Sequence, residues 1–192
     1  MQTSIALPDA VLTMKSAEDA KARVSQQLAL LADEAHDESI ARLIQQMETT
    51  RFPEWEPPQM TLCRVDPNIL NFIRRDHIWL SVDWENAGWG DAAFEIADLM
   101  AHPSYIQVAP TRWDWVIGQY CRLMNDPQME TRIRTYHRIM LVWWVVRCAR
   151  YLYDIPRGRD PRLVDHLAER QADFQAKSAH YLRAANAALQ IE

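Results

Sequence analysis

The sequence predicts a mainly α-helical domain that contains a small β hairpin or mini-sheet. Three observations favour this fold class: apolar residues recur at helical spacing, cap residues precede those stretches, and β-like runs are confined to residues 61–85. Of the 192 residues, 48% are hydrophobic and 24% are charged. That length and composition are typical of one globular domain with a sizeable core.

The first two helices are expected within residues 16–49, after an extension over residues 1–15. Ser16 and Asp19 resemble a capping box at the start of the first helix. Apolar residues then fall on one face of each helix: Val24, Leu28 and Leu31 in the first, and Ile40, Leu43, Ile44 and Met47 in the second.

Residues 91–190 read as a helical region. Asp91 is placed to cap a helix that ends before Pro103, and a further helix is expected over residues 113–124. Asp126 and Pro127 then open a long helix that reaches about Tyr153. It should be roughly 40 Å long and central, because its middle is apolar on every side. Asp160 and Pro161 open the last helix, whose apolar stripe is Leu163, Leu167, Phe174, Tyr181, Ala185 and Leu189.

The β-like region places polar residues among apolar ones. Short runs at 61–64, 71–73 and 77–84 are expected to form strands, with residues 74–77 as a turn. Asp66, Asn71 and Asp83 fall at the edges of these strands. Burial of such groups without partners costs several kcal/mol, whereas strand ends can hold them rigidly around one point. Three oxygen-bearing side chains held together predict a magnesium or phosphoryl site.

Charge and cysteine content exclude several classes of protein. The net charge of −5 gives no global field that favours nucleic acid or an anionic membrane. The longest apolar run, at 139–146, is too short to span a membrane, and the N-terminus lacks the features of a signal peptide. The three cysteines lack disulfide or zinc spacing, so a cytoplasmic protein with reduced thiols is expected; they are Cys63, Cys121 and Cys148.

The β-like region also carries a family pattern. Asp66-x-x-x-x-Asn71, followed by Asp83-Trp-Glu85 and Gly-x-Gly-Asp91, resembles the aminoglycoside phosphotransferase and choline kinase family. These are small-molecule kinases with a protein-kinase-like fold. The resemblance implies that Asp66 is the catalytic aspartate, which orients or accepts the proton of the substrate hydroxyl. It implies that Asn71 binds a metal ion and that Asp83 holds the magnesium that bridges the phosphates of ATP.

The same resemblance implies that residues 16–192 form the helical C-terminal lobe of such a kinase, with catalytic and metal loops at 61–91 and a helical subdomain at 91–190. Arg64-Val65 stands where the family usually has His-Gly, and Ala92 replaces a common proline. Arg64, Glu85 and Asp91 are candidates for supporting roles.

The N-terminal lobe of the family is not apparent in the sequence. The four glycines all follow the catalytic loop, and the three lysines lie in or beside expected helices, so neither a glycine-rich loop nor a strand lysine is seen. The chain is therefore expected to be a truncated kinase or a single lobe, with the other lobe supplied by a separate chain or lost upstream. Such a lobe should expose an apolar patch, which a separate N-lobe chain or a second copy could cover.

Two functions follow from these observations. One is an ATP- and magnesium-dependent phosphotransferase lobe that acts on a hydroxyl of a small molecule, and the other is a non-catalytic, pseudokinase-like binding or regulatory module. Asp66 with Pro67 would also suit a simple turn. For the substrate, acids could attract a cationic aminoglycoside, or tryptophans could surround a quaternary amine, although both sets also suit ordinary surface and core positions. The acids are Asp98, Asp114, Asp126 and Glu130, and the tryptophans are Trp84, Trp89, Trp113 and Trp115.

Overall fold

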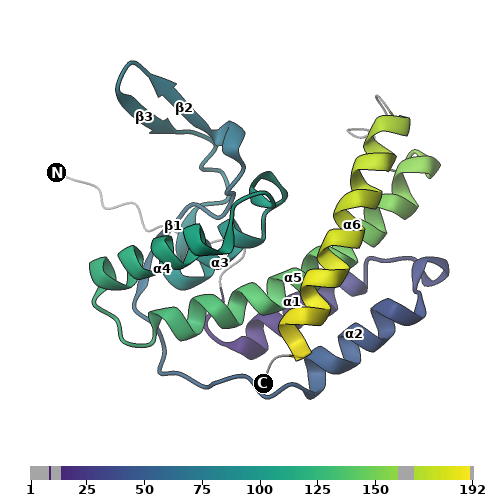
Figure 1. Ribbon diagram of the computed structural model, residues 1–192, viewed down its shortest axis with the longest axis horizontal. Coiled ribbons are helices and arrows are strands. Elements are labelled where there is room, and N and C mark those ends of the chain that lie inside the picture. The colour runs from purple at the N-terminus through teal and green to yellow at the C-terminus, as the bar shows by residue number, and fades with distance from the viewer. Residues whose placement is uncertain (1–8, 10–13, 160–166, 191–192) are drawn as a thin grey trace. The chain divides into compact units, whose positions relative to one another are not determined.

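The computed structural model describes residue 9, residues 14–159 and residues 167–190 (Figure 1). Within them the chain is mainly helical with two small antiparallel sheets, which confirms the expected fold class. The helices are α1 (Ala17–Leu28), α2 (Glu38–Thr49), α3 (Ala92–Ala101), α4 (Pro110–Met124), α5 (Met129–Asp154) and α6 (Leu167–Gln190). The strands are β1 (Met60–Cys63), β2 (Phe72–Arg75), β3 (Ile78–Ser81) and β4 (Gly88–Asp91). The expected cap at Asp160-Pro161 and the stripe residue Leu163 lie outside the described residues.

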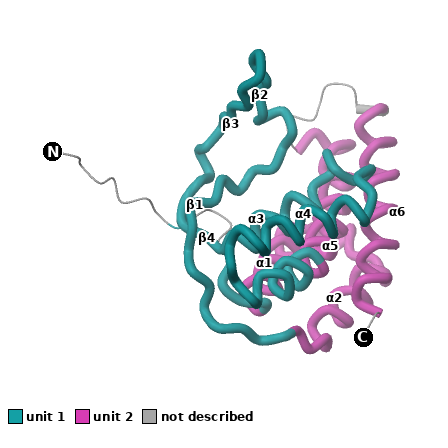
Figure 2. Tube along the Cα trace, turned by 60° about the vertical axis from the view of Figure 1, so that its left-hand side comes forward, with its two compact units in different colours: residues 1–17, 53–137 teal, residues 18–52, 138–192 magenta. Residues whose placement is uncertain are grey.

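The contacts group the chain into two compact units. Unit 1 comprises residues 1–17 and 53–137, and unit 2 comprises residues 18–52 and 138–192 (Figure 2). The long helix α5 spans the boundary between the two units, which falls after His137. All expected site residues lie in unit 1.

Unit 1 contains two nested strand pairs. β1 pairs with β4, and β2 pairs with β3 across a turn at Asp76 and His77. This confirms the predicted hairpin, but the turn is shorter than the expected 74–77 because Arg74 and Arg75 extend β2. Residues 82–84, expected to be part of the third strand, lie beyond the end of β3. The β2–β3 hairpin projects from the rest of unit 1 (Figures 1 and 2).

Strand β4 corrects the sequence interpretation, which treated the Gly-x-Gly-Asp segment as part of a loop. Gly88 lies opposite Cys63 in the register, and Gly90 lies opposite Thr61. Both glycines are buried. Glycine is normally depleted in strands, and it is tolerated where another segment approaches the backbone closely. The low strand propensity of glycine therefore predicted a loop at residues 88–91. Pairing with β1 makes this segment a strand instead.

Helix α3 links the sheet to the helices of unit 1. Asp91 caps it as predicted, because its Oδ1 accepts a hydrogen bond of 2.9 Å from the Ala93 amide. The helix packs against β1 and β4. Its buried side chains are mostly small, which allows the close approach: Ala92, Ala93, Phe94, Ala97, Asp98 and Ala101.

Helices α4 and α5 differ little from the expected ranges. Helix α4 begins at Pro110, three residues before the predicted start, and ends at Met124, after which Asn125 adopts the left-handed conformation. The middle of α5 is buried, as its all-round apolar sequence predicts, and the buried residues include Ile139, Met140, Val142, Val145 and Val146. In the part of the chain that the structure describes, none of the helices combines the length and apolarity that a membrane crossing requires.

Unit 2 is built from α1 from Glu18 onward, α2, the part of α5 from Arg138 onward, and α6. Asp37 caps α2 by accepting a 2.9 Å hydrogen bond from the Ile40 amide. Helix α6 packs against α2 and buries Tyr181, Ala185 and Leu189 from the predicted stripe. The Tyr181 ring stacks on Trp144 at 5.5 Å.

Candidate functional site

Two loops of unit 1 carry the expected site residues. We call residues 64–71, between β1 and β2, the first loop, and residues 82–87, between β3 and β4, the second loop. Because the strand pairs are nested, both loops connect the same two pairs (Figure 2). The loops meet beside the hairpin, where the Val82 amide donates a 2.9 Å hydrogen bond to the Asn71 carbonyl oxygen. This bond places the residue before Asp83 against Asn71.

Asp66 and Asn71 are in direct contact. The Asn71 amide Nδ2 donates a 3.0 Å hydrogen bond to Asp66 Oδ2, and the Asn68 backbone amide donates to Asp66 Oδ1 at 3.2 Å. Asn71 is buried, whereas Asp66 is half-buried. Each carboxylate oxygen can accept a further hydrogen bond, so the contacts orient the Asp66 side chain and leave it able to bind a ligand.

Two contacts from outside the first loop fix its backbone. Glu95 Oε1 on α3 accepts a 2.9 Å hydrogen bond from the Arg64 amide, and the Tyr105 hydroxyl donates to the Pro67 carbonyl oxygen at 2.8 Å. Between them Val65 has a φ of 59°, which is costly for a β-branched residue. Strained backbone of this kind persists only where its surroundings hold it, and it is often found at functional sites.

Asp83, on the second loop, is more exposed than Asp66 and Asn71. Its side chain is exposed, and among the described residues it has no hydrogen-bond or ion-pair partner. Its φ of 62° is again in the left-handed region. Asp66 and Asn71 are thus in contact. Asp83 directly follows Val82, whose amide is bonded to the Asn71 carbonyl oxygen.

A buried acid lies next to this site. Asp98 on α3 is 6% exposed. Burial raises its pKa to about 7, and the nearby negative charges of Asp66 and Glu95 act in the same direction. Burial likewise raises the pKa of the Cys63 thiol to about 12, so Cys63 is a buried thiol and not an activated nucleophile.

The supporting candidates have distinct positions. Arg64 is buried, with its guanidinium carbon 4.7 Å from the centre of the Phe72 ring. Glu85 is exposed on the second loop. Asp91 is 1% exposed and accepts hydrogen bonds from Arg132 Nε at 2.9 Å and from the Tyr136 hydroxyl at 3.2 Å. These bonds give Asp91 a structural role in the core of unit 1.

The substrate-binding candidates differ in exposure: Trp84, Trp89, Trp115, Asp114 and Glu130 are exposed, and Trp113 and Asp126 are half-buried. Trp84 is 46% exposed and Trp89 is 43% exposed. The Trp84 indole donates a 3.0 Å hydrogen bond to the Ser81 carbonyl oxygen, which fixes it against the end of β3. Asp98 is buried within α3 and is not a surface acid.

Sequence reasoning missed Glu95 and Tyr105, which hold the first loop. Their hydrogen bonds go to backbone atoms 31 and 38 residues away in the chain. A side chain that binds a distant backbone group leaves no local pattern, because any residue type can supply the amide or carbonyl. Only the topology reveals these two contacts.

Exposed apolar residues are concentrated in one segment of unit 1. We call residues 69–84 the hairpin segment. It holds nine of the fourteen exposed large hydrophobic residues of the described chain: Ile69, Leu70, Phe72, Ile73, Ile78, Trp79, Leu80, Val82 and Trp84. A patch of this kind is typical of an interaction surface.

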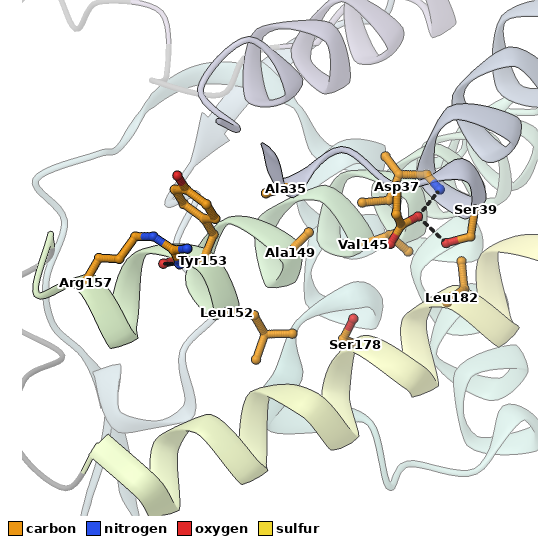
Figure 3. A pocket seen from close by; sticks show the side chains of 11 residues that line it. Ala35, Asp37, Ser39, Val145, Ala149, Leu152, Tyr153, Arg157, Ser178 and Leu182 are labelled. Atoms are coloured by element: carbon orange, nitrogen blue, oxygen red, sulfur yellow. Dashed lines mark hydrogen bonds between the residues drawn. The ribbon is translucent and has the colours of Figure 1, made fainter. Parts of the chain in front are cut away.

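Each unit contains a cavity of similar size. In unit 1 a cavity of about 320 Å³ is lined by residues of both loops, α3 and α4. In unit 2 a cavity of about 310 Å³ lies between α5, α6 and residues 35–40 (Figure 3). There Asp37 already binds the Ile40 amide and the Ser39 hydroxyl, so this carboxylate serves as the helix cap. The cavity in unit 1 adjoins the expected site residues.

No family model, no curated protein and no solved structure matches this chain. Among the described residues there is also no cluster of three His, Cys, Asp or Glu side chains suited to a metal ion. The case for a function therefore depends on the geometry of the two loops.

Proposed function

We propose that this chain is the catalytic lobe of an ATP- and magnesium-dependent phosphotransferase that acts on a hydroxyl group of a small molecule. The observation that carries the proposal is the pairing of Asp66 with Asn71 at 3.0 Å, combined with the backbone bond between Asn71 and Val82 next to Asp83. It unites on two adjoining loops the three residues that resemble the family's catalytic and metal residues.

The donor set fits a magnesium ion bound mainly by its nucleotide. Asn71 uses its Nδ2 for Asp66, which leaves Oδ1 as an oxygen ligand, and the exposed Asp83 carboxylate supplies another. Magnesium commonly takes one or two protein oxygens and completes its shell with phosphates and water. When bound, the ion would neutralise phosphate charge.

The chain's own residues would position the acceptor. Asp66, held by Asn71 and the Asn68 amide, would orient the substrate hydroxyl and take its proton. Phosphoryl transfer asks little covalent chemistry of a protein, so positioning of this kind accounts for much of the catalysis.

A non-catalytic binding or regulatory module is the second candidate, and one observation favours it. The hairpin segment exposes a concentrated apolar surface beside the two loops. In a working kinase lobe, a second lobe or a partner chain would cover this surface and enclose the nucleotide. A protein that uses the surface only to bind a partner would need no turnover.

Magnesium-dependent ATP binding and phosphoryl transfer test the two candidates. The chain is titrated with ATP with and without magnesium. It is then assayed, with an N-terminal lobe supplied, on aminoglycosides, choline, ethanolamine and simple sugars. We expect magnesium-dependent binding, and turnover that Asp66→Asn lowers by about 100-fold or more without a change in unfolding. Asp76→Asn in the hairpin turn is the matched control, because Asn also tolerates its φ of 54°. Full turnover in Asp66→Asn would refute the role of Asp66, and magnesium–ATP binding without turnover would favour the binding module.

A further inference from the structure

The cavity in unit 1 is built from segments that adjoin the site. Pro67, Phe72 and Trp84 line it, and they directly follow Asp66, Asn71 and Asp83 in the sequence. Its volume of about 320 Å³ is at the lower end of the range for small-molecule sites. The cavity therefore has the size and position of a ligand site.

Two polar atoms of the cavity walls lack partners. Arg64 Nη1 and Ser81 Oγ are buried, and neither has a hydrogen-bond partner among the described residues. Native proteins leave few buried donors unpaired, because the lost hydration is not replaced. An occupant that brings a hydrogen-bond acceptor to Arg64 and Ser81 would remove this cost.

The rest of the walls are apolar and partly aromatic. Phe72, Trp84 and Tyr120 contribute rings, and Leu99 contributes an aliphatic face. Rings of this kind pack well against a flat aromatic body. Phe72 is 38% exposed and Trp84 is 46% exposed, so both rings border the open side of the cavity.

The charges of the cavity select a neutral occupant. Glu95 also lines the cavity, and its charge acts on nearby Asp98 together with that of Asp66. A carboxylate would be attracted by Arg64, but it would be repelled by Glu95 and by the nearby Asp66 and Asp98, which together outnumber that one cation. A simple cation would meet Arg64 and would leave its Nη1 without an acceptor.

We propose that this cavity binds a neutral aromatic molecule with a carboxamide or carbonyl group, whose oxygen accepts hydrogen bonds from Arg64 Nη1 and Ser81 Oγ. Binding requires neither ATP nor a metal ion, so this site goes beyond the proposed phosphotransferase function. Its test is independent of turnover.

Calorimetric titration of the full chain with indole-3-acetamide and indole-3-acetate tests the proposal near neutral pH. The two probes have almost the same shape and differ in charge. We expect the amide to bind at least about tenfold more tightly than the acetate. Arg64→Met should weaken binding of the amide about tenfold, Ser81→Ala should weaken it severalfold, and Leu99→Trp should abolish it by filling the cavity.

Leu123→Trp is the matched control for Leu99→Trp, because Leu123 is 80% exposed on α4. It should leave amide binding unchanged. If Arg64→Met does not fold, Ser81→Ala still removes one of the two donors without adding bulk. The proposal is overturned if both probes bind equally, if neither binds, or if Ser81→Ala and Leu99→Trp retain the full affinity for the amide.

Discussion

Two carboxylates of helix α3 and its cap, Asp91 and Asp98, are both buried in unit 1 but have opposite surroundings. Asp91 is 1% exposed and is bonded to Arg132, Tyr136 and the Ala93 amide. Asp98 is 6% exposed, and the charges that act on it are those of two other acids, Asp66 and Glu95. One carboxylate is matched by a cation and donors, and the other lies in a group of like charges.

The difference separates a structural cluster from a site. A buried charge with a cation and several donors stabilises the fold only while all partners remain. Buried acids that share a negative environment instead shift each other's pKa, and such shifts are concentrated at functional sites. The Asp91 cluster thus supports the base of α3, while the group of acids that includes Asp98 lies where the first loop brings in Asp66.

The largest expected effect comes from breaking the matched cluster. Arg132→Met leaves the Asp91 carboxylate buried without its cation, although Arg132 also pairs with Asp126 at 2.8 Å. We expect the free energy of unfolding to fall by about 3 to 5 kcal/mol. Urea denaturation followed by circular dichroism measures this change.

Arg134→Met is the matched control, two residues further along the same helix. Arg134 pairs with Glu130 and Asp114, but its side chain is 48% exposed. Its loss should cost less than about 1 kcal/mol. Adding Asp91→Asn to Arg132→Met should restore part of the stability, because the uncompensated charge is gone. Similar losses for the two single variants would show that Asp91 does not depend on Arg132.

The next largest effect is the pH dependence of stability that Asp98 causes. The pKa of Asp98 is raised from 3.8 to about 7 in the fold, so between these values the native state holds a proton that the unfolded chain releases. The free energy of unfolding therefore falls as pH rises through this window and levels off above it. Asp98→Asn should remove this pH dependence because the amide does not titrate. The difference in the free energy of unfolding, variant minus unsubstituted chain, should therefore increase by roughly 2 to 3 kcal/mol from about pH 5 to about pH 8.

Urea denaturation at the two pH values gives this difference directly. Asp114→Asn, at an acid whose side chain is 59% exposed, is the control and should show little change with pH. If Asp98→Asn follows the same pH dependence as the unsubstituted chain, Asp98 is not the titrating group. The contrast with Asp91 would then lose its basis.

Much of the fold could be predicted because its signals are local. The cap at Asp91 and the hairpin with its turn near residues 74–77 both formed as the sequence indicated, although the turn is two residues shorter. The burial of the middle of α5 followed from its apolar residues on all sides. Each of these depends on residues within a turn or two of one another, where propensity and periodicity act.

The rest depended on contacts between distant segments. Strand β4 formed at Gly88 and Gly90 because β1 offers a partner, which no local propensity shows. The charged group of Asp66, Glu95 and Asp98 arises where α3 meets the first loop. The candidate site was proposed from the spacing of Asp66, Asn71 and Asp83. The residues that fix the first loop or add negative charge beside it could not be identified from the sequence.

The smallest expected effect tests how firmly the first loop is held. Tyr105→Phe removes the 2.8 Å hydrogen bond to the Pro67 carbonyl oxygen and keeps the ring. We expect a loss of about 1 kcal/mol in the free energy of unfolding, and faster hydrogen exchange at the Asn68 and Asn71 amides. Tyr153→Phe, which removes a hydrogen bond to the exposed Glu34, is the control and should leave exchange at these amides unchanged. If Tyr105→Phe leaves exchange in the first loop unaffected, the hydrogen bond from the Arg64 amide to Glu95 is enough to fix the loop. That bond to α3 would then be what maintains the strained backbone at Val65.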